Sequence, residues 1–446
     1  MKDDSQVVLI RRRYLVTWRE TAKGGFGIPS LYNARIAIDA LGIECSYDTF
    51  HEKLLVGFKG DAAKHELTQI EGEVSDHVII RLRQILSEQY GFDFTEQYVR
   101  DAVISLALEN CFDPVCDMLD EAEADWDGIE RLDAMAVDYF KAADTKLNRA
   151  FVRKMMIAAV RRARHPGCKF DNIVVFESPE GWFKSTAIRI LAGDENFSDQ
   201  SILGAKDREI QEQLAEVWIH ENADLAGMKK AEVEQVKAYA SRQIDRGRPA
   251  YGRFPKKQPR HCIDVGTTNK MSEYLQSPDG NRRFWPVKIT KCVDLEKLQR
   301  DRLQLWGEAA RCESQGESIT LGELWNDAVK AQEQRRVKDS WEPVLASLTP
   351  QKVVADPDGF EKKVVHEVKK AEVNGQVSTQ WRASTADLLN FALGLRPGHQ
   401  NRGHSMRLSD AMRNIGWERH SHGKVTIDDK QVNGYFCDVY CYPQKS

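Results

Sequence analysis

The spacing of apolar and polar positions changes along this chain. Over 76–91, 94–111 and 149–165, apolar residues recur at the interval of an amphipathic helix. Thr95 is a suitable capping residue for the second of these segments. The pattern therefore predicts helices here, preceded up to about residue 85 by a mixture of short strand-like and helical pieces.

The middle of the chain alternates short apolar runs with helical stretches. The runs are NIVVF (172–176), VWIHE (217–221) and CIDVGTTN (262–269). Helical stretches of about ten to fifteen residues separate them, and this alternation is typical of βα units. An α/β fold with a parallel sheet is predicted.

The C-terminal part has a third pattern. Two short helices are predicted at 384–395 and 405–417, followed over 420–442 by alternating residues with a turn at DDKQVNG, as in a β-hairpin. Two helices and a hairpin outline a winged helix-turn-helix, in which Arg407 and Arg413 are candidate DNA contacts. A small packing domain or an oligomer contact is the alternative.

Composition limits the classes of protein to consider. The chain has 446 residues, of which 41% are hydrophobic and 30% charged, as in soluble globular proteins. Its apolar runs are shorter than the roughly 18 residues that span a bilayer, so no membrane partner is predicted. The start shows no secretion signal, and nine cysteines without a CxxC pair favour a reducing cytoplasm.

Positive charge is concentrated in one segment, although the chain as a whole carries a small net negative charge. The formal net charge is −4, yet residues 237–261 hold eight lysines or arginines and one acid, Asp245. By itself such a stretch favours a solvated loop over nucleic-acid contact, and only its position in the fold can reverse that interpretation.

The stretch VVFESPEGWFKSTAIRILAG (174–193) resembles a phosphate-binding loop. Of the pattern G-x-x-x-x-G-K-[ST], Ser178 and Phe183 occupy the glycine positions, and Gly181 lies between them. A bulky residue at the Phe183 position costs on the order of 1 kcal/mol if its backbone is left-handed. The predicted ligands of this loop are ATP and Mg²⁺. The predicted binding residues are Ser178, Pro179, Glu180, Gly181, Trp182, Phe183, Lys184, Ser185 and Thr186.

Polar residues follow the later strands at the positions that a nucleotide site requires. Glu221 ends the second apolar run and Asp224 follows three residues later, as ligands or orienting groups for a metal and the attacking water. Asn269 ends the third run as a candidate sensor. Arg282 and Arg283 precede another apolar strand, where an arginine can reach the γ-phosphate of a neighbouring subunit.

A family resemblance rests on several of these stretches. FDPVCDMLDEAEADWDGIERLD and VRRARHPGCKFDNIVVFESPEGWFKST are followed by ENADL, QIDRGRPAYGRF, PRHCIDVGTTN and DGNRRFWPV. The chain resembles the virulence-associated protein E family, which consists of phage and prophage P-loop ATPases akin to superfamily 3 helicases. The match covers roughly residues 95–310.

The resemblance implies an AAA+-like core that acts on DNA as a hexameric ring. Lys184 and Ser185 then hold phosphates and Mg²⁺, Glu221 is the Walker B acid, Asn269 the sensor, and either arginine the finger. The basic stretch falls at a central-channel hairpin, with Tyr251 and Phe254 as stacking rings. Its candidate phosphate contacts are Arg246, Arg248, Arg253, Lys256 and Lys257. His220 departs from the family pattern, since many ATPases have a second acid there.

These observations predict five regions. They are an N-terminal accessory region (1–92), a helical domain (93–165), a P-loop ATPase core (166–330), a linker with a helix (331–378) and a winged-helix-like domain (379–446).

Two functions remain open. The first is an ATP-dependent DNA motor, a helicase or replication-initiation ATPase of a phage or mobile element in a bacterial cytoplasm. Such a motor hydrolyses ATP at subunit interfaces and is stimulated by single-stranded DNA. The second is a non-motor DNA-binding or assembly protein with a degenerate nucleotide loop.

Overall fold

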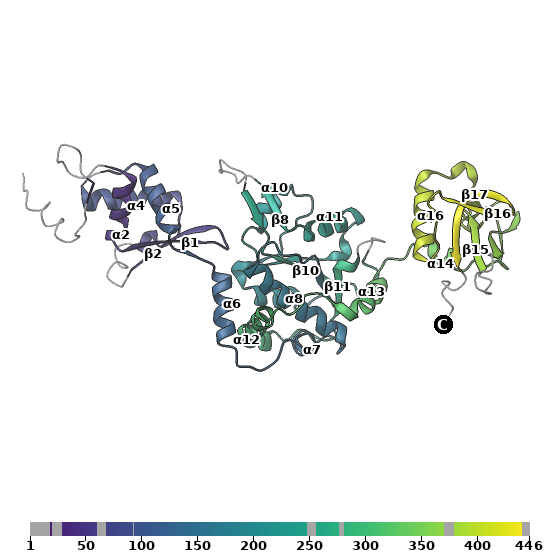
Figure 1. Cartoon of the computed structure of the whole chain (residues 1–446), viewed down its shortest axis with the longest axis horizontal. Coiled ribbons are helices and arrows are strands. Elements are labelled where there is room, and N and C mark those ends of the chain that lie inside the picture. Colours follow the sequence, from purple (N-terminus) through teal and green to yellow (C-terminus); the bar gives the residue numbers. More distant parts are fainter. Residues whose placement is uncertain are drawn as a thin grey trace, which may run out of the picture. The chain divides into compact units, whose positions relative to one another are not determined.

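The computed structural model describes residues 18–19, 29–59, 68–91, 93–247, 256–275, 281–369 and 379–438 (Figure 1). The chain divides into two compact units, one of residues 1–271 and 282–330, the other of 272–281 and 331–446. Each unit is described by itself.

A five-stranded parallel sheet forms the centre of the first unit. The order is β11-β5-β10-β7-β6, so β10 lies between β5 and β7 although it follows both in sequence. This confirms the predicted α/β class with a parallel sheet. The strands are β5 (Ile173–Glu177), β6 (Phe197–Ser198), β7 (Ile219–Asn222), β10 (Ile263–Thr268) and β11 (Phe284–Lys288).

Long helices bury this sheet, which explains its almost wholly buried strands. Helices α8 (Lys146–Arg164), α9 (Lys184–Ala192) and α12 (Leu295–Ser314) share one hydrophobic core with its strands, and α10 (Asp207–Leu214) and α11 (Lys230–Ala240) belong to the same unit. Aromatic residues fill the core between them: Trp218 and Trp306 have ring centroids 4.3 Å apart, and Phe151 stacks on Trp285. The predicted helix at 149–165 is confirmed and begins slightly earlier.

The N-terminal part of this unit has a mixed sheet of its own, with strand order β3-β2-β1-β4. One hydrophobic core joins residues from Ala34 to Ala107, so the boundary predicted at residue 92 falls inside it. Helix α5 therefore packs with this part rather than with the helices that follow. The elements are α2 (Leu31–Ala40), β1 (Ile43–Asp48), β2 (Lys53–Phe58), β3 (Gly72–Glu73), α4 (Asp76–Tyr90), α5 (Glu96–Ala107) and β4 (Cys111–Phe112).

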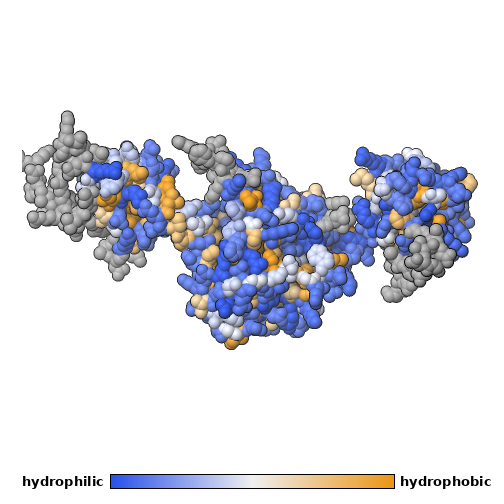
Figure 2. Space-filling view, in the orientation of Figure 1, coloured by the Kyte–Doolittle hydropathy of each residue, from blue (hydrophilic) through white to orange (hydrophobic). Residues whose placement is uncertain are grey.

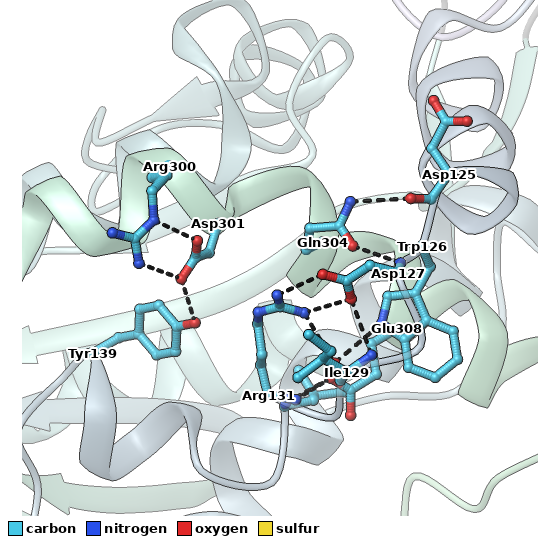
Figure 3. Close-up of polar contacts among 11 residues, drawn as sticks. Asp125, Trp126, Asp127, Ile129, Arg131, Tyr139, Arg300, Asp301, Gln304 and Glu308 are labelled. Carbon is cyan, nitrogen blue, oxygen red and sulfur yellow. Dashed lines mark hydrogen bonds and ion pairs between the residues drawn. The ribbon is translucent and has the colours of Figure 1, made fainter.

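The WDG stretch of the family resemblance is a structural loop between α6 (Pro114–Ala124) and α7 (Met135–Asp138). Figure 3 shows the paired side chains of Asp127 and Arg131 beside α12. Glu308 of α12 accepts hydrogen bonds from the backbone N–H groups of Arg131 and Leu132, at 2.6 and 2.8 Å. The loop is thus attached to the helix that covers the sheet.

The basic stretch forms a two-stranded antiparallel ribbon of β8 (Ile244–Gly247) and β9 (Lys256–Pro259). Its connection, residues 248–255, lies outside the described residues, and with it the predicted contacts Arg248, Tyr251, Arg253 and Phe254.

The second unit holds a four-stranded antiparallel sheet in the order β14-β15-β17-β16. Leu345, Leu348, Val364 and Val365 belong to its core, so the segment predicted as a linker from 331 to 378 is part of the fold. The elements are α14 (Trp341–Ala346), β12 (Val353–Ala355), β13 (Glu361–Lys363), β14 (Val365–Lys369), β15 (Thr379–Ser384), α15 (Thr385–Asp387), α16 (Arg402–Asn414), β16 (Lys424–Ile427) and β17 (Lys430–Asp438).

The helix predicted at 384–395 is a three-residue α15 followed by a π-helix at Leu388–Ala392, and the second helix and the hairpin are present with shifted bounds. The helix expected at 405–417 begins after Asn401, whose side chain accepts from the His404 N–H at 2.9 Å. The hairpin turns at Asp428 and Asp429, which both have positive φ, whereas the Asn-Gly pair of the predicted turn lies inside β17.

On the face that Figure 2 displays, hydrophilic residues dominate and apolar residues show only in small patches. Each helix in the described part of the chain is too short or too polar to span a bilayer.

Candidate nucleotide-binding site

The loop between β5 and α9 has the backbone of an anion-binding turn. Gly181 has φ 80°, and Phe183 has φ 63° and ψ 26°, both in the left-handed region. Phe183 is 49% exposed, so little packing compensates a left-handed strain of about 1–2 kcal/mol. The loop delivers the N-terminus of α9, whose free N–H groups and dipole favour an anion.

Lys184 lies at the centre of this loop and is buried. Its Nζ donates to Ser178 Oγ at 2.9 Å, to the carbonyls of Ser178 and Pro179 at 3.2 Å, and to Asn269 Oδ1 at 3.0 Å. Burial lowers the pKa of the Lys184 ammonium, and the carboxylates of Glu221 and Glu180 oppose that shift. The predicted lysine and sensor are thus in direct contact.

Glu221 joins β7 to the start of α9. Its Oε1 accepts from the hydroxyls of Ser185 at 2.7 Å and Thr267 at 2.6 Å. Its Oε2 is buried and has no hydrogen-bond partner among the described residues. A buried carboxylate oxygen of this kind needs a ligand, and Mg²⁺ prefers carboxylate and hydroxyl oxygens. Ser185 and Glu221 therefore fit the predicted metal.

Asp224 follows at the end of β7, exposed and in a left-handed conformation with φ 47°. It lines a cavity of about 280 Å³. The other lining residues include Asp199, Gln200, His220, Glu221, Asn222, Gly227 and Glu232.

The opposite face of β7 carries a second polar cluster. His220 pairs in register with Asp264 of β10, and its Nδ1 lies 3.0 Å from Asp264 Oδ1. Its Nε2 lies 3.0 Å from the carbonyl oxygen of Gln200. Asn222 donates to the same Asp264 oxygen at 3.1 Å.

The hydrogen bonds of this cluster favour a negative charge on Asp264. A carbonyl oxygen only accepts, so Nε2 of His220 carries a hydrogen. Burial raises the pKa of Asp264, but the hydrogen bonds and charge of His220 outweigh it and leave this pKa below its usual value. The hydrogen bonds from His220 and Asn222 therefore favour the ionised form of the buried Asp264.

Asp264 was not selected from the sequence. It is a charged residue inside a fully buried strand, and that irregularity is the signal that could have identified it.

Arg282 and Arg283 lie at the other end of the sheet. Phe284, which follows them, pairs with Ile173 at the start of β5, whereas the phosphate loop follows Glu177 at its end. A five-residue strand separates these ends by about 16 Å. Arg283 donates to Ser241 Oγ at 3.0 Å and pairs with Asp171 at 3.3 Å. No hydrogen bond or ion pair connects the guanidinium of Arg282 to a described residue.

The predicted nucleic-acid residues are dispersed. Arg246 of β8 and Lys257 of β9 are partners in the strand register, Lys256 precedes Lys257 in β9, and Lys257 is exposed. In the second unit, Arg407 is occupied: it pairs with Asp339 at 2.8 and 2.9 Å and lies over the Trp341 ring. Arg413 is exposed on α16, with Asp410 3.7 Å away.

A family comparison agrees with the resemblance drawn from the sequence. Residues 119–338 match the virulence-associated protein E-like domain. The chain carries a virulence-associated protein E-like domain. This domain spans the WDG loop, the phosphate loop, the acidic strand and both arginines. No curated protein matches the chain.

Solved structures similar to this virulence-associated protein E-like chain include apo structures of the NrS-1 C-terminal region. One, of residues 305–718, has a TM-score of 0.44 and 11% identity and covers 72% of this chain and 79% of its own. Another, an A-form structure, has a TM-score of 0.43 and 11% identity and covers 92% and 99%.

Proposed function

We propose that this chain is an ATP-dependent DNA motor of a phage or mobile element, with an AAA+-like core. The observation that carries the proposal is the contact of Lys184, Ser185, Glu221 and Asn269, contributed by three different strand ends. Ligands of parallel sheets bind outside the carboxyl ends of the strands, where these residues lie. The insertion of β10 between β5 and β7 places Asn269 beside the loop and Glu221 one strand further.

In this proposal the substrate is ATP. Lys184 exchanges its loop carbonyls for phosphate oxygens, and the N–H groups at the start of α9 cradle the phosphates. Ser185 and Glu221 would hold Mg²⁺, which would supply the positive charge that neutralises the phosphate oxygens. Asn269 orients the lysine through the hydrogen bond that it already makes.

The position of the arginines supports hydrolysis between subunits. They lie at the amino ends of the strands, about 16 Å from the phosphate loop, so they cannot reach a nucleotide bound to their own loop. An arginine supplied by a neighbouring copy completes the site in a ring, which we propose to be hexameric. Such a contribution is worth about 10³–10⁵ in kcat in related mechanisms.

DNA contact is proposed at two places. The β8–β9 ribbon pairs Arg246 with Lys257 in register and places Lys256 next to Lys257 in β9, which supports a strand-tracking element. In the second unit, α16 precedes the β16–β17 hairpin, and β15 pairs with β17, an order that supports a winged helix. Arg413 is the better contact there, because Arg407 is already paired.

The test is steady-state ATP hydrolysis with and without single-stranded DNA. The wild type should turn over ATP and be stimulated by DNA, and Lys184→Ala should abolish this. Lys330→Ala is the matched control, since Lys330 is 77% exposed and only 3.4 Å from one acid, Asp327. DNA binding without turnover in the wild type would contradict the motor.

One observation favours the second function, a non-motor DNA-binding or assembly protein. Phe183 holds a left-handed position without side-chain capping, and a weakened loop can retain nucleotide without hydrolysing it. In that case nucleotide would raise the melting temperature of the wild type, and turnover would be absent.

A further inference from the structure

Phe183 combines two unusual properties in the phosphate loop. Its backbone is left-handed, with φ 63°, a conformation that favours the glycine expected at this position of the pattern. Its neighbour Trp182 packs against the hydrophobic core, whereas the Phe183 side chain is 49% exposed. The phenyl group therefore contributes little to the fold of its own copy, although its backbone is strained.

A cavity of about 320 Å³ lies at the opposite end of the sheet. Its lining residues include Asn172, which precedes β5, and Arg282, which precedes β11, so it lies at the amino ends of these strands. The buried Trp285 and Leu321 and the 44% exposed Trp325 supply apolar surface. A cavity of roughly 150 Å³ already holds benzene, so an aromatic side chain fits here.

The loop and the cavity carry opposite free charges. Glu180 of the loop is exposed, and no hydrogen bond or ion pair connects its carboxylate to a described residue. Lys169 and Arg282 line the cavity and are exposed, and their cationic groups are equally without such a contact to the described chain. Asp171, the acid among the lining residues, is already paired with Arg283 at 3.3 Å. An exposed phenyl group beside an acid thus matches an aromatic cavity beside two cations.

The loop and the cavity lie at opposite ends of β5, so a single copy cannot join them. The loop follows Glu177 and the cavity includes Asn172, and the ends of the strand are about 16 Å apart. A contact between the loop of one copy and the cavity of the next is head-to-tail, the kind of contact that closes into a ring. Because Phe183 immediately precedes Lys184, the same contact brings Arg282 towards the nucleotide of the neighbouring copy.

We propose that Phe183 anchors the subunit interface by inserting its phenyl group into the cavity beside Arg282 of the next copy; this rests on the ring of the proposed function. Glu180 meets Lys169 in the same contact. The side chain that replaces the loop glycine is thus an assembly contact rather than a defect of the loop, and the partner that it fits is a second copy of this chain.

The test measures self-association of the full chain by sedimentation velocity over a range of concentrations, with Mg²⁺ and a non-hydrolysable ATP analogue. Phe183→Gly should weaken association by more than about tenfold, as the loss of an interface anchor does. It should keep its melting temperature, because glycine takes the left-handed backbone without strain. Trp325→Ala removes aromatic surface from the cavity and should weaken association similarly.

Val329→Ala is the matched control. Val329 is 46% exposed on the same helix as Trp325, α13 (Trp325–Glu333), but does not line the cavity, so this variant should associate as the wild type does.

A mixture of the two weakened variants tests the pairing directly. Phe183→Gly chains keep the cavity and Trp325→Ala chains keep the phenyl group, so equal amounts should form dimers although neither variant associates alone. Wild-type association in Phe183→Gly, a mixture that stays monomeric, or a monomeric wild type would each overturn the inference. A wild type that associates through Phe183 but hydrolyses no ATP would refute the motor and leave the anchor standing.

Discussion

The two faces of β7 differ in how completely their polar groups are paired. On one face, His220, Asn222 and Asp264 bind one another and the Gln200 carbonyl, and this buried group is closed. On the other face, one residue along the chain, Glu221 keeps a buried oxygen without a partner in the described chain. We call the first the closed face, because its hydrogen bonds connect β7 to β10. We call the second the open face, because one oxygen of Glu221 is available for a ligand.

The same contrast separates the two arginines before β11. Arg283 is held by Ser241 and Asp171, while the guanidinium of Arg282 makes no such contact with a described residue. These two adjacent arginines therefore differ in their contacts, although their side chains are chemically the same. The contrast indicates Arg282 as the finger and Arg283 as the residue that fixes the turn.

The arginine pair gives the largest expected effect. Arg282→Ala should lower kcat by about 10³-fold or more, because it removes the charge that stabilises the transition state in the neighbouring copy. Arg283→Ala should chiefly lower the melting temperature. Mixing Arg282→Ala with Lys184→Ala chains should restore part of the turnover, since each supplies what the other lacks. Equal losses of turnover in both arginine variants, without loss of stability, would contradict the division.

The closed face of β7 gives the next effect, on stability rather than turnover. Asp264→Asn removes the buried carboxylate that binds His220 and Asn222 and should lower the free energy of unfolding by about 1–3 kcal/mol. Glu221→Gln should change it far less, because the open face loses only contacts to two hydroxyls. Urea unfolding followed by circular dichroism measures both. A smaller loss in Asp264→Asn than in Glu221→Gln would reverse the comparison.

The sequence predicted which polar residues follow the strand ends of the site. It did not predict which charged residues are already bound by other side chains. Apolar runs locate β5, β7 and β10, and polar residues directly after them must meet at one edge of a parallel sheet. Whether a given acid or arginine is free is decided by residues distant in sequence. Asp264 binds His220 from 44 positions away, and Asp339 binds Arg407 from 68 positions away.

Local patterns also misplace boundaries for a physical reason. Helix α5 resembles any amphipathic helix, and only its apolar partners, such as Ala34 and Ile38 of α2, show that it packs with the N-terminal sheet. In the C-terminal hairpin, the turn predicted at DDKQVNG is confined to its first two residues, and Gly434 is needed within β17 because a Cβ there would collide with the Ala383 carbonyl.

Glu317 is a carboxylate whose hydrogen bonds make the stability of the fold depend on pH. Glu317 accepts from Arg153 at 2.7 and 3.0 Å and from Lys154 at 2.8 Å. Hydrogen bonds from Arg153, above all, lower the pKa of Glu317 from 4.5 to about 2, although burial opposes them. A carboxyl whose pKa is lower in the folded state stabilises the fold above its unfolded pKa.

That stabilisation is complete above about pH 4.5 and is lost as the pH falls towards 2. Glu317→Gln should therefore be less stable than the wild type by about 1–3 kcal/mol at pH 7 and should approach it near pH 2. Thermal unfolding at several pH values measures the difference. A constant difference at all pH values would mean that the glutamate acts through packing alone.

The smallest expected effect is on DNA binding by the two arginines of α16, of which Arg407 is paired and Arg413 is exposed. Arg413→Ala should weaken binding to duplex DNA by about 1 kcal/mol and reduce the salt dependence by the release of about one ion, because an exposed cation can meet a phosphate. Arg407→Ala should leave that salt dependence unchanged, because its guanidinium is committed to Asp339 and Trp341. Fluorescence anisotropy at several salt concentrations separates the two. A lower salt dependence in Arg407→Ala alone would mean that its ion pair opens on DNA, and that pairing within the chain does not by itself exclude a residue from function.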